Sequence, residues 1–582
     1  MANVSHRRIA CCLATVLGMT LSALAGCADR SEQARRIQRQ QQLLQEEAGS
    51  YDHLRETFLL LTRLGESDLN AASGQLSYHL NAWREKVSSD GYPLPTELLA
   101  SWQSLLPTAQ ATAEIARKEF AASDVEHFRL QYLLHCVTQR VLEKPCIDPW
   151  LESRVDQVGL TDQSDYQLRV ASRLFDWVIR NVQQEPLEIQ FPDTPSLPAL
   201  GQGLTFMGPG YRQTTWEALW RGSADGLLRA DIFLQLCRHA NLPACMLSVP
   251  NQTDPQGDPW LCAVVIAGEA FLFDTQLGLP IPGTNERGIA TLTAARRDPS
   301  ILRRLRVAGF FDYPLSSTDI QQTIPLLNAT PELLSHRMRL LTESFAGDQR
   351  INLHLDAQAV ADAFTQLPGI STARLWTLPL RARQYAEAVQ DAMRDNIALA
   401  QWYYVQYGMF DELGALGRAR WRHLQGSFDN IEEEDLQGAR VLYMDLRRPE
   451  FELADLRLNV RLQKEYALER QRGETEEVYQ RRIAFIQDVL RETKRTATFW
   501  LGQMHFEEQR WETAEKWMDG RVLQDPAAAR WHPLARYHLA RIHEQMGQPD
   551  QAERLLKTAG DVQEQGNRIR ARLLLDASKS ER

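Results

Sequence analysis

The chain has 582 residues and a net charge of −10, with 44% apolar and 24% charged residues. These proportions are ordinary for a globular protein of several domains, and the acidic balance argues against non-specific nucleic-acid binding. No stretch after residue 26 holds eighteen uninterrupted apolar residues, so we expect no membrane-spanning helix in the body of the protein.

The N-terminus has the pattern of an export signal. Arg7 and Arg8 precede an uncharged, mostly apolar run that ends in Leu24-Ala25-Gly26-Cys27. This ending resembles the lipobox of bacterial lipoproteins, and the resemblance implies cleavage before Cys27 and lipidation of its thiol, palmitate included. An ordinary signal peptide that happens to contain a cysteine is the alternative. Two or three acyl chains would hold the protein stably on a membrane.

Cleavage would remove residues 1–26 and change the net charge from −10 to −12, because that segment carries Arg7 and Arg8 and no acid. Residues 27–50 are rich in glutamine and arginine and are predicted to form a tether. The small residue Ala28 after the cysteine favours, by analogy with lipoprotein sorting, the outer membrane facing the periplasm over the inner membrane.

Residues 51–150 are predicted to be helical and without visible chemistry. Leu76, Leu80, Trp83 and Val87 recur at steps of four, three and four, which places them on one face of a helix.

Five cysteines remain beyond Cys27, and export makes disulfides possible. Cys136–Cys146 would close a short loop, and Cys245–Cys262 would join adjacent strands, but sequence alone does not fix the pairing. No C-x-x-C or H-E-x-x-H motif occurs, so neither a metal site nor a cofactor is predicted.

Residues 151–315 carry the most informative pattern. A buried helix over 227–240 is followed by Asn241-Leu242-Pro243-Ala244 and by three strand-like runs, the last two joined as a hairpin near Gly268-Glu269. Together with Leu236-Cys237-Arg238 and Phe273-Asp274, these residues resemble the papain-like transglutaminase core over about 100 of the 582 residues. The resemblance implies a helix packed on an antiparallel sheet.

The catalytic residues of that family are not intact. The resemblance puts the nucleophilic cysteine, which belongs at a helix N-terminus, at Gly226. The expected histidine is missing from the segment Gly257-Asp258-Pro259-Trp260, and only Asp274 matches. Because an acid alone has no nucleophile to orient, the sequence predicts a degenerate, inactive domain. A displaced nucleophile is the alternative, although Cys237 and His239, two residues apart on a helix, face away from each other.

Residues 316–400 are predicted to be a mixed α/β connecting region, and residues 401–582 to be helical. Leu501-Gly502 with Ala514, and Leu539-Ala540 with Ala552, resemble tetratricopeptide repeats at about 495–527 and 533–565. The two units lie 38 residues apart, so about four extra residues near Ala527–Arg530 lengthen the connection relative to the usual spacing of about 34. Such arrays present a concave face to peptides or partner proteins.

Short basic clusters are interpreted as solvated helix faces beside acids; they are Arg296-Arg297, Arg303-Arg304 and Arg447-Arg448.

The sequence thus predicts a mainly α protein with a central α+β domain. The leading hypothesis is a lipid-anchored envelope protein that acts as a non-catalytic interaction or scaffold module, binding the membrane through its lipid and proteins through its repeats. The first alternative is a cysteine-dependent acyl transferase or peptidase with a displaced nucleophile. A purely structural spacer is the second.

Overall fold

Helices dominate the protein: 61% of it is helix and 9% is strand, which confirms the mainly α class with a small mixed sheet. The computed structural model describes residues 52–66, 69–87, 96–186, 213–347, 350–432, 436–466 and 468–580. The predicted signal, Cys27 and the tether up to residue 50 lie outside these residues. None of the helices in the described ranges is both long and apolar enough to cross a membrane.

The first helices cover the region predicted to be helical. Leu76, Leu80 and Trp83 are buried along one face of α4, as their spacing predicts. The elements are α3 (His53–Thr62), η1 (Leu64–Glu66), α4 (Leu69–Arg84), α5 (Thr96–Leu99), η2 (Ala100–Trp102), α6 (Thr108–Ala116), α7 (Asp124–Glu143) and α8 (Pro149–Asp156).

A helix buried on all sides forms the centre of the next region. Every residue of α11 (Gly226–His239) is buried, and the helix begins at Asp225, whose carboxylate accepts hydrogen bonds from the backbone N–H groups of Leu227 and Leu228 at 2.8 and 3.0 Å. It is preceded by α9 (Asp162–Asn181), β1 (Gln183–Gln184), α10 (Thr215–Arg221) and β2 (Ser223–Ala224), and β1 pairs with β2 in parallel.

The main sheet has six strands in the order β6-β5-β4-β3-β7-β8, all antiparallel except the β7–β8 pair. A two-residue turn, Ala267-Gly268, joins β4 to β5 with positive φ at both residues, one position before the predicted turn. The strands are β3 (Ala244–Val249), β4 (Asp258–Ile266), β5 (Glu269–Asp274), β6 (Leu279–Pro280), β7 (Ile324–Leu327) and β8 (Arg374–Leu375).

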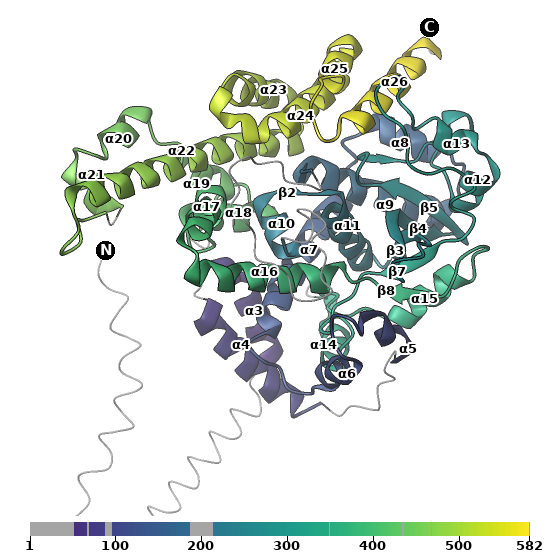
Figure 1. Cartoon of the computed structure of the whole chain (residues 1–582), viewed down its shortest axis with the longest axis horizontal. Coiled ribbons are helices and arrows are strands. Elements are labelled where there is room, and N and C mark those ends of the chain that lie inside the picture. Colours follow the sequence, from purple (N-terminus) through teal and green to yellow (C-terminus); the bar gives the residue numbers. More distant parts are fainter. Residues whose placement is uncertain are drawn as a thin grey trace, which may run out of the picture. The chain divides into compact units, whose positions relative to one another are not determined.

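Both faces of this sheet are covered. On one face, α11 contacts β3 and β4, and α9 contacts β4 (Figure 1). On the other, Leu247, Leu261 and Leu272 join a core that includes Trp102 and Ile569 from opposite ends of the chain. The surrounding elements are η4 (Thr284–Glu286), α12 (Leu292–Arg297), α13 (Ser300–Arg303), α14 (His336–Ser344), α15 (Ala357–Thr365) and α16 (Leu378–Asp395).

The two disulfides considered from the sequence are not formed, since all five described cysteines are free thiols. Cys245 pairs with Ala263 across β3 and β4, whereas Cys262 pairs with Met246. Neighbouring positions of a strand point to opposite faces, so the Cys245 and Cys262 side chains lie on different sides of the sheet. Cys136 hydrogen-bonds Tyr132, while the sulfur of Cys146 contacts the backbone of Asp148.

The C-terminal half is helical from α17 onward. The long helix α22 runs beside α23 and α24 (Figure 1). The elements are α17 (Ile397–Tyr407), η6 (Gly408–Phe410), α18 (Ala415–Gln425), α19 (Ala439–Asp445), α20 (Glu450–Asp455), α21 (Val460–Glu465), α22 (Glu476–Glu507), α23 (Trp511–Trp517), the π-helical turn η8 (Met518–Leu523), η9 (Pro526–Trp531), α24 (His532–Gln545), α25 (Pro549–Leu556) and α26 (Glu564–Ser580).

The predicted repeat positions form two helix pairs, α22 with α23 and α24 with α25. Gly502 lets α22 closely approach the end of α23 and the start of η8, because a Cβ there would meet the Met518 side chain at 3.0 Å and that of Trp517 at 3.2 Å. Ala514, Ala540 and Ala552 are fully buried. The extra residues of the lengthened connection fall in η9, directly after the π-helical turn.

A buried ion cluster joins these C-terminal helices to α8 and α9. Arg541, fully buried on α24, binds Asp148 and Asp176, each at 3.0 Å. Arg570 on α26 binds both carboxylate oxygens of Asp148 at 3.0 Å and Glu544 at 2.6 Å. Burial alone would raise the pKa of Asp176, but Arg180 and Arg541 hold it below its usual value. All the helices that the cluster joins belong to one compact unit, Thr57–Arg582.

We expect Arg541→Met to lower the free energy of unfolding by about 3–5 kcal/mol, because it removes one of the two arginines that Asp148 and Asp176 each bind and leaves an unbalanced negative charge in the interior. Urea unfolding followed by circular dichroism measures this loss. The matched control is Arg481→Met, which removes an exposed pair with Glu477 and is expected to cost about 1 kcal/mol or less. Equal losses in both variants would contradict the role assigned to the buried cluster.

Candidate functional site

The predicted nucleophile position is filled by packing. Gly226 is the first residue of α11 and is buried, and a Cβ at this position would overlap Cγ of Gln276. Its carbonyl oxygen accepts a hydrogen bond of 2.7 Å from the hydroxyl of Thr275. As the Gln276 side chain lies, the N-terminus of α11 has no room for the side chain of a cysteine at position 226.

Asp274 has a structural role at the end of β5. One carboxylate oxygen caps the backbone N–H groups of Gln276 and Leu277 at 2.9 Å, and the other accepts a hydrogen bond of 3.0 Å from Tyr313. The Tyr313 hydroxyl in turn accepts a hydrogen bond of 2.8 Å from the indole of Trp260. Burial raises the pKa of Asp274 to about 6, against the effect of these hydrogen bonds. Trp260 belongs to the segment in which the resemblance places a histidine. It is linked to Asp274 through Tyr313, and its indole cannot act as a base.

The five described cysteines are poor nucleophiles. Burial raises the pKa of Cys136 to about 11 and that of Cys146 to about 12. It raises the pKa of Cys237, Cys245 and Cys262 further. Since the thiolate is the reactive form, none of these residues has the environment of a displaced nucleophile.

We expect iodoacetamide at pH 7 to leave all five of these cysteines unmodified in the folded protein and to modify all five after denaturation in urea. Mass spectrometry of the digested protein measures the modification of each thiol. A cysteine that reacts within minutes in the folded protein would favour the cysteine-dependent enzyme instead.

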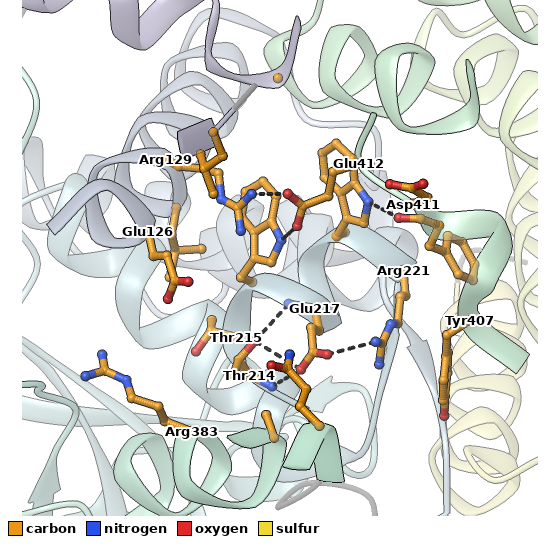
Figure 2. Close-up of a pocket in the computed structure, with 18 of the residues that line it drawn as sticks. Glu126, Arg129, Thr214, Thr215, Glu217, Arg221, Arg383, Tyr407, Asp411 and Glu412 are labelled. Atoms are coloured by element: carbon orange, nitrogen blue, oxygen red, sulfur yellow. Dashed lines mark hydrogen bonds and ion pairs between the residues drawn. The ribbon is translucent and has the colours of Figure 1, made fainter. Parts of the chain in front are cut away.

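A cavity of about 940 Å³ lies away from these residues, between α7, α10, α16, α17, α18 and α22. Figure 2 shows how charged and aromatic side chains from these elements converge on it. Among the described residues, no group of histidine, cysteine, aspartate and glutamate side chains could hold a metal ion, in this cavity or elsewhere.

One wall is an arginine–tryptophan–glutamate group. The guanidinium of Arg129 (α7) lies 3.7 Å over the ring of Trp216 and forms an ion pair with Glu412, which precedes α18. The Trp216 indole donates a hydrogen bond of 2.7 Å to Glu412 (Figure 2), and its ring stacks on Trp220 at 4.9 Å. Both the Trp216 ring and the Glu412 carboxylate are therefore already bound within the protein.

A second wall is set by the start of α10. Thr214 and Glu217 form a capping box, in which each side chain binds the other's backbone N–H group. Glu217 also accepts a hydrogen bond of 2.8 Å from Arg221, whose guanidinium lies 3.9 Å over the ring of Tyr407. Burial alone would lower the pKa of Arg221, but Glu217 and the tyrosines hold it above its usual value. The side chains of this wall are therefore held in place by contacts within the protein.

The rim of the cavity is acidic. Glu126, Glu387 and Asp411 are exposed, and no ion pair within the described ranges holds any of the three. The cavity's arginines have carboxylate partners; Arg383, for example, binds Glu332 through two hydrogen bonds of 3.0 and 3.2 Å. The free charge that this cavity offers a ligand is therefore negative.

Exposed apolar surface continues outward from the cavity along α17. Only Leu399 of its eleven residues is buried, although the helix is apolar on all sides. Tyr404 is 55% exposed and Leu413, nearby at the cavity, 61%. Apolar surface of this kind in a folded protein often marks a binding site.

Sequence reasoning missed this cavity because its walls come from segments hundreds of residues apart, with no local motif. The run Trp402-Tyr403-Tyr404-Val405, too aromatic for a surface helix, is the one signal that could have drawn attention to it.

Comparisons of the chain with protein-family models, with curated proteins and with solved structures yield no match.

Proposed function

We propose that this protein is an exported lipoprotein, anchored at Cys27, that binds a partner without catalysis in the envelope. The observation that carries the proposal is the 940 Å³ cavity with its acidic rim and aromatic walls. Its volume falls within the range of about 300–1,000 Å³ typical of ligand sites.

The ligand we propose is an extended, positively charged peptide segment of a partner protein. The exposed carboxylates Glu126, Glu387 and Asp411, which form no ion pair within the described ranges, favour a cationic ligand. Glycan binding usually needs open aromatic faces for stacking, whereas Trp216 is already stacked with Arg129 and Trp220. Gln390, which is exposed at the cavity, offers an amide group suited to a peptide backbone, whereas Gln131 and Gln235 are buried and hydrogen-bond each other at 3.0 Å.

The lack of catalysis is supported by the central domain. We propose that α9, α11 and β3–β5 form a degenerate transglutaminase-like core, because α11 packs on β3 and β4 in the predicted order. Gly226, buried beside Gln276, and Asp274, bound to Tyr313, serve packing there.

The C-terminal helices, which we propose to be tetratricopeptide-like, take part through α22. Phe485, Ile486 and Val489 of this helix line the cavity. Other polar side chains of the array are engaged within the protein: Gln503 donates a hydrogen bond of 2.9 Å to the carbonyl of Arg180, and Arg541 binds Asp148 and Asp176. Because these side chains are already bound within the protein, they are not available to a partner. This favours the cavity as the place where a partner binds.

The peptide proposal is tested by calorimetric titration of the detergent-solubilised lipoprotein with an eight-residue peptide of alternating lysine and alanine. We expect the triple variant Glu126→Gln, Glu387→Gln, Asp411→Asn to bind it about tenfold more weakly, since three exposed charge pairs are each worth about 0.5 kcal/mol. Binding by the wild type should also weaken with added salt.

The control variant carries the same change of charge at remote exposed acids, Glu97→Gln, Glu477→Gln and Asp550→Asn. It should bind the lysine peptide like the wild type. Equal weakening in both triple variants, or equal binding of a glutamate–alanine peptide, would refute a specific cationic site.

The anchor is tested separately by feeding cells radiolabelled palmitate. We expect the wild-type protein to carry the label and to sediment with the outer membrane, because its lipid buries acyl chains in the bilayer. Cys27→Ser should carry no label and keep residues 1–26. Label retained by Cys27→Ser would place the modification elsewhere, and sedimentation with the inner membrane would correct the assigned location.

A further inference from the structure

A second pocket, of about 290 Å³, lies beside the middle of α22. It is lined by Arg447, Glu450, Arg491, Lys494, Arg495, Thr498, Gly520, Arg521, Asp525 and Ala528. Five of these residues are cationic and two are acidic, although the whole chain carries −10. A local excess of positive charge in an acidic protein needs an explanation beyond composition.

One side of the pocket is a single face of α22. Arg491, Lys494, Arg495 and Thr498 follow one another at helical spacing. Arg491 binds Glu450 at 2.8 Å, and Arg495 binds Asp525 at 3.4 Å, so both acids of the lining are already paired. Within the described ranges no ion pair holds Lys494, which leaves its ammonium group available to a ligand.

The opposite side holds two arginines against one tryptophan. The guanidinium groups of Arg447 and Arg521 lie 4.7 and 5.0 Å from the ring centre of Trp517. Arg447 donates a hydrogen bond of 3.0 Å to Thr498, and neither arginine has a carboxylate partner in the part of the chain that the structure describes. Because both guanidinium groups lie over Trp517, their like charges are close together, and burial and the charge of Arg521 lower the pKa of Arg447. Arg447 is therefore not the solvated surface residue expected from the sequence.

The backbone that carries Arg521 is unusual. Residues Met518–Leu523 form a π-helical turn, a rare conformation that is frequent at functional sites. Asp525 and Ala528 follow in the connection between the two helix pairs. The pocket is thus built where the chain departs from regular repeat spacing.

We propose that this pocket binds a phosphate-bearing ligand. Arginine guanidinium groups match phosphate oxygens with paired hydrogen bonds, and Lys494 adds a third unpaired cation. The cavity is larger than one phosphate group, so it has room for the adjoining part of a phosphate ester. The ligand's phosphate belongs either to a soluble compound or to a lipid headgroup.

The experiment is calorimetric titration of the full mature lipoprotein in detergent with three probes: inorganic pyrophosphate, dihexanoylphosphatidic acid and dihexanoylphosphatidylcholine. We expect micromolar to millimolar binding of at least one of the first two and none of the choline lipid, whose phosphate is screened by its own cation. Binding of pyrophosphate alone identifies a soluble ligand, and tighter binding of the phosphatidic acid identifies a lipid headgroup. Failure of both anionic probes to bind would overturn the proposal.

The variant Lys494→Gln, Arg521→Gln should weaken this binding at least tenfold without changing the unfolding temperature of the free protein, because neither side chain has an ion partner to lose. The control, Arg510→Gln, Lys516→Gln, removes the same charges from exposed positions nearby, together with the ion pair of Arg510 and Glu508, and should bind like the wild type. Equal weakening of probe binding by both variants would mean that general electrostatic attraction accounts for the binding. That result would refute a specific phosphate site. The outcome is independent of the acidic cavity, since no residue lines both pockets.

Discussion

The buried ion cluster around Arg541 is the constraint on which the rest of the structure depends. Asp148, Asp176 and Glu544 face Arg541, Arg570 and Arg180 in the interior, and the charges balance. Charges removed from water are costly unless every one is paired in good geometry, so the C-terminal helices are held in one position against α8 and α9. That position also brings Ile569 of α26 into the core of the sheet.

The long helix α22 contributes side chains to both pockets. Its first half contributes Phe485, Ile486 and Val489 to the acidic cavity, and the next two turns contribute Arg491 to Thr498 to the basic pocket. One helix therefore lines both the cavity with the acidic rim and the pocket with an excess of arginine and lysine. As proposed, a protein that binds a cationic peptide at one pocket and a phosphate at the other would hold these two ligands near each other.

At the centre of the chain, the two positions that the proposed resemblance would make catalytic take part in packing contacts and hydrogen bonds instead. Gly226 occupies a helix N-terminus, a place where backbone N–H groups would favour a thiolate, but Gln276 closes the space above it. Asp274 lies at the end of β5. Its carboxylate accepts hydrogen bonds from the backbone of the following turn and from the Tyr313 hydroxyl. Both residues now stabilise the junction between α11 and the sheet.

The sequence by itself determined the features that depend on neighbours along the chain. Helical periodicity predicted the face of Leu76, Leu80 and Trp83, and strand patterns predicted the β4–β5 hairpin to within one residue. Residue identity alone showed that no thiol stands at Gly226. Tertiary structure decided everything that depends on distant residues: Asp148 meets Arg570 across 422 positions, and sheet register, not spacing, sets Cys245 and Cys262 on opposite faces. Neither pocket was predicted, because a side chain's charge and shape can be read from the sequence, whereas the side chains it will meet are fixed only when the chain packs.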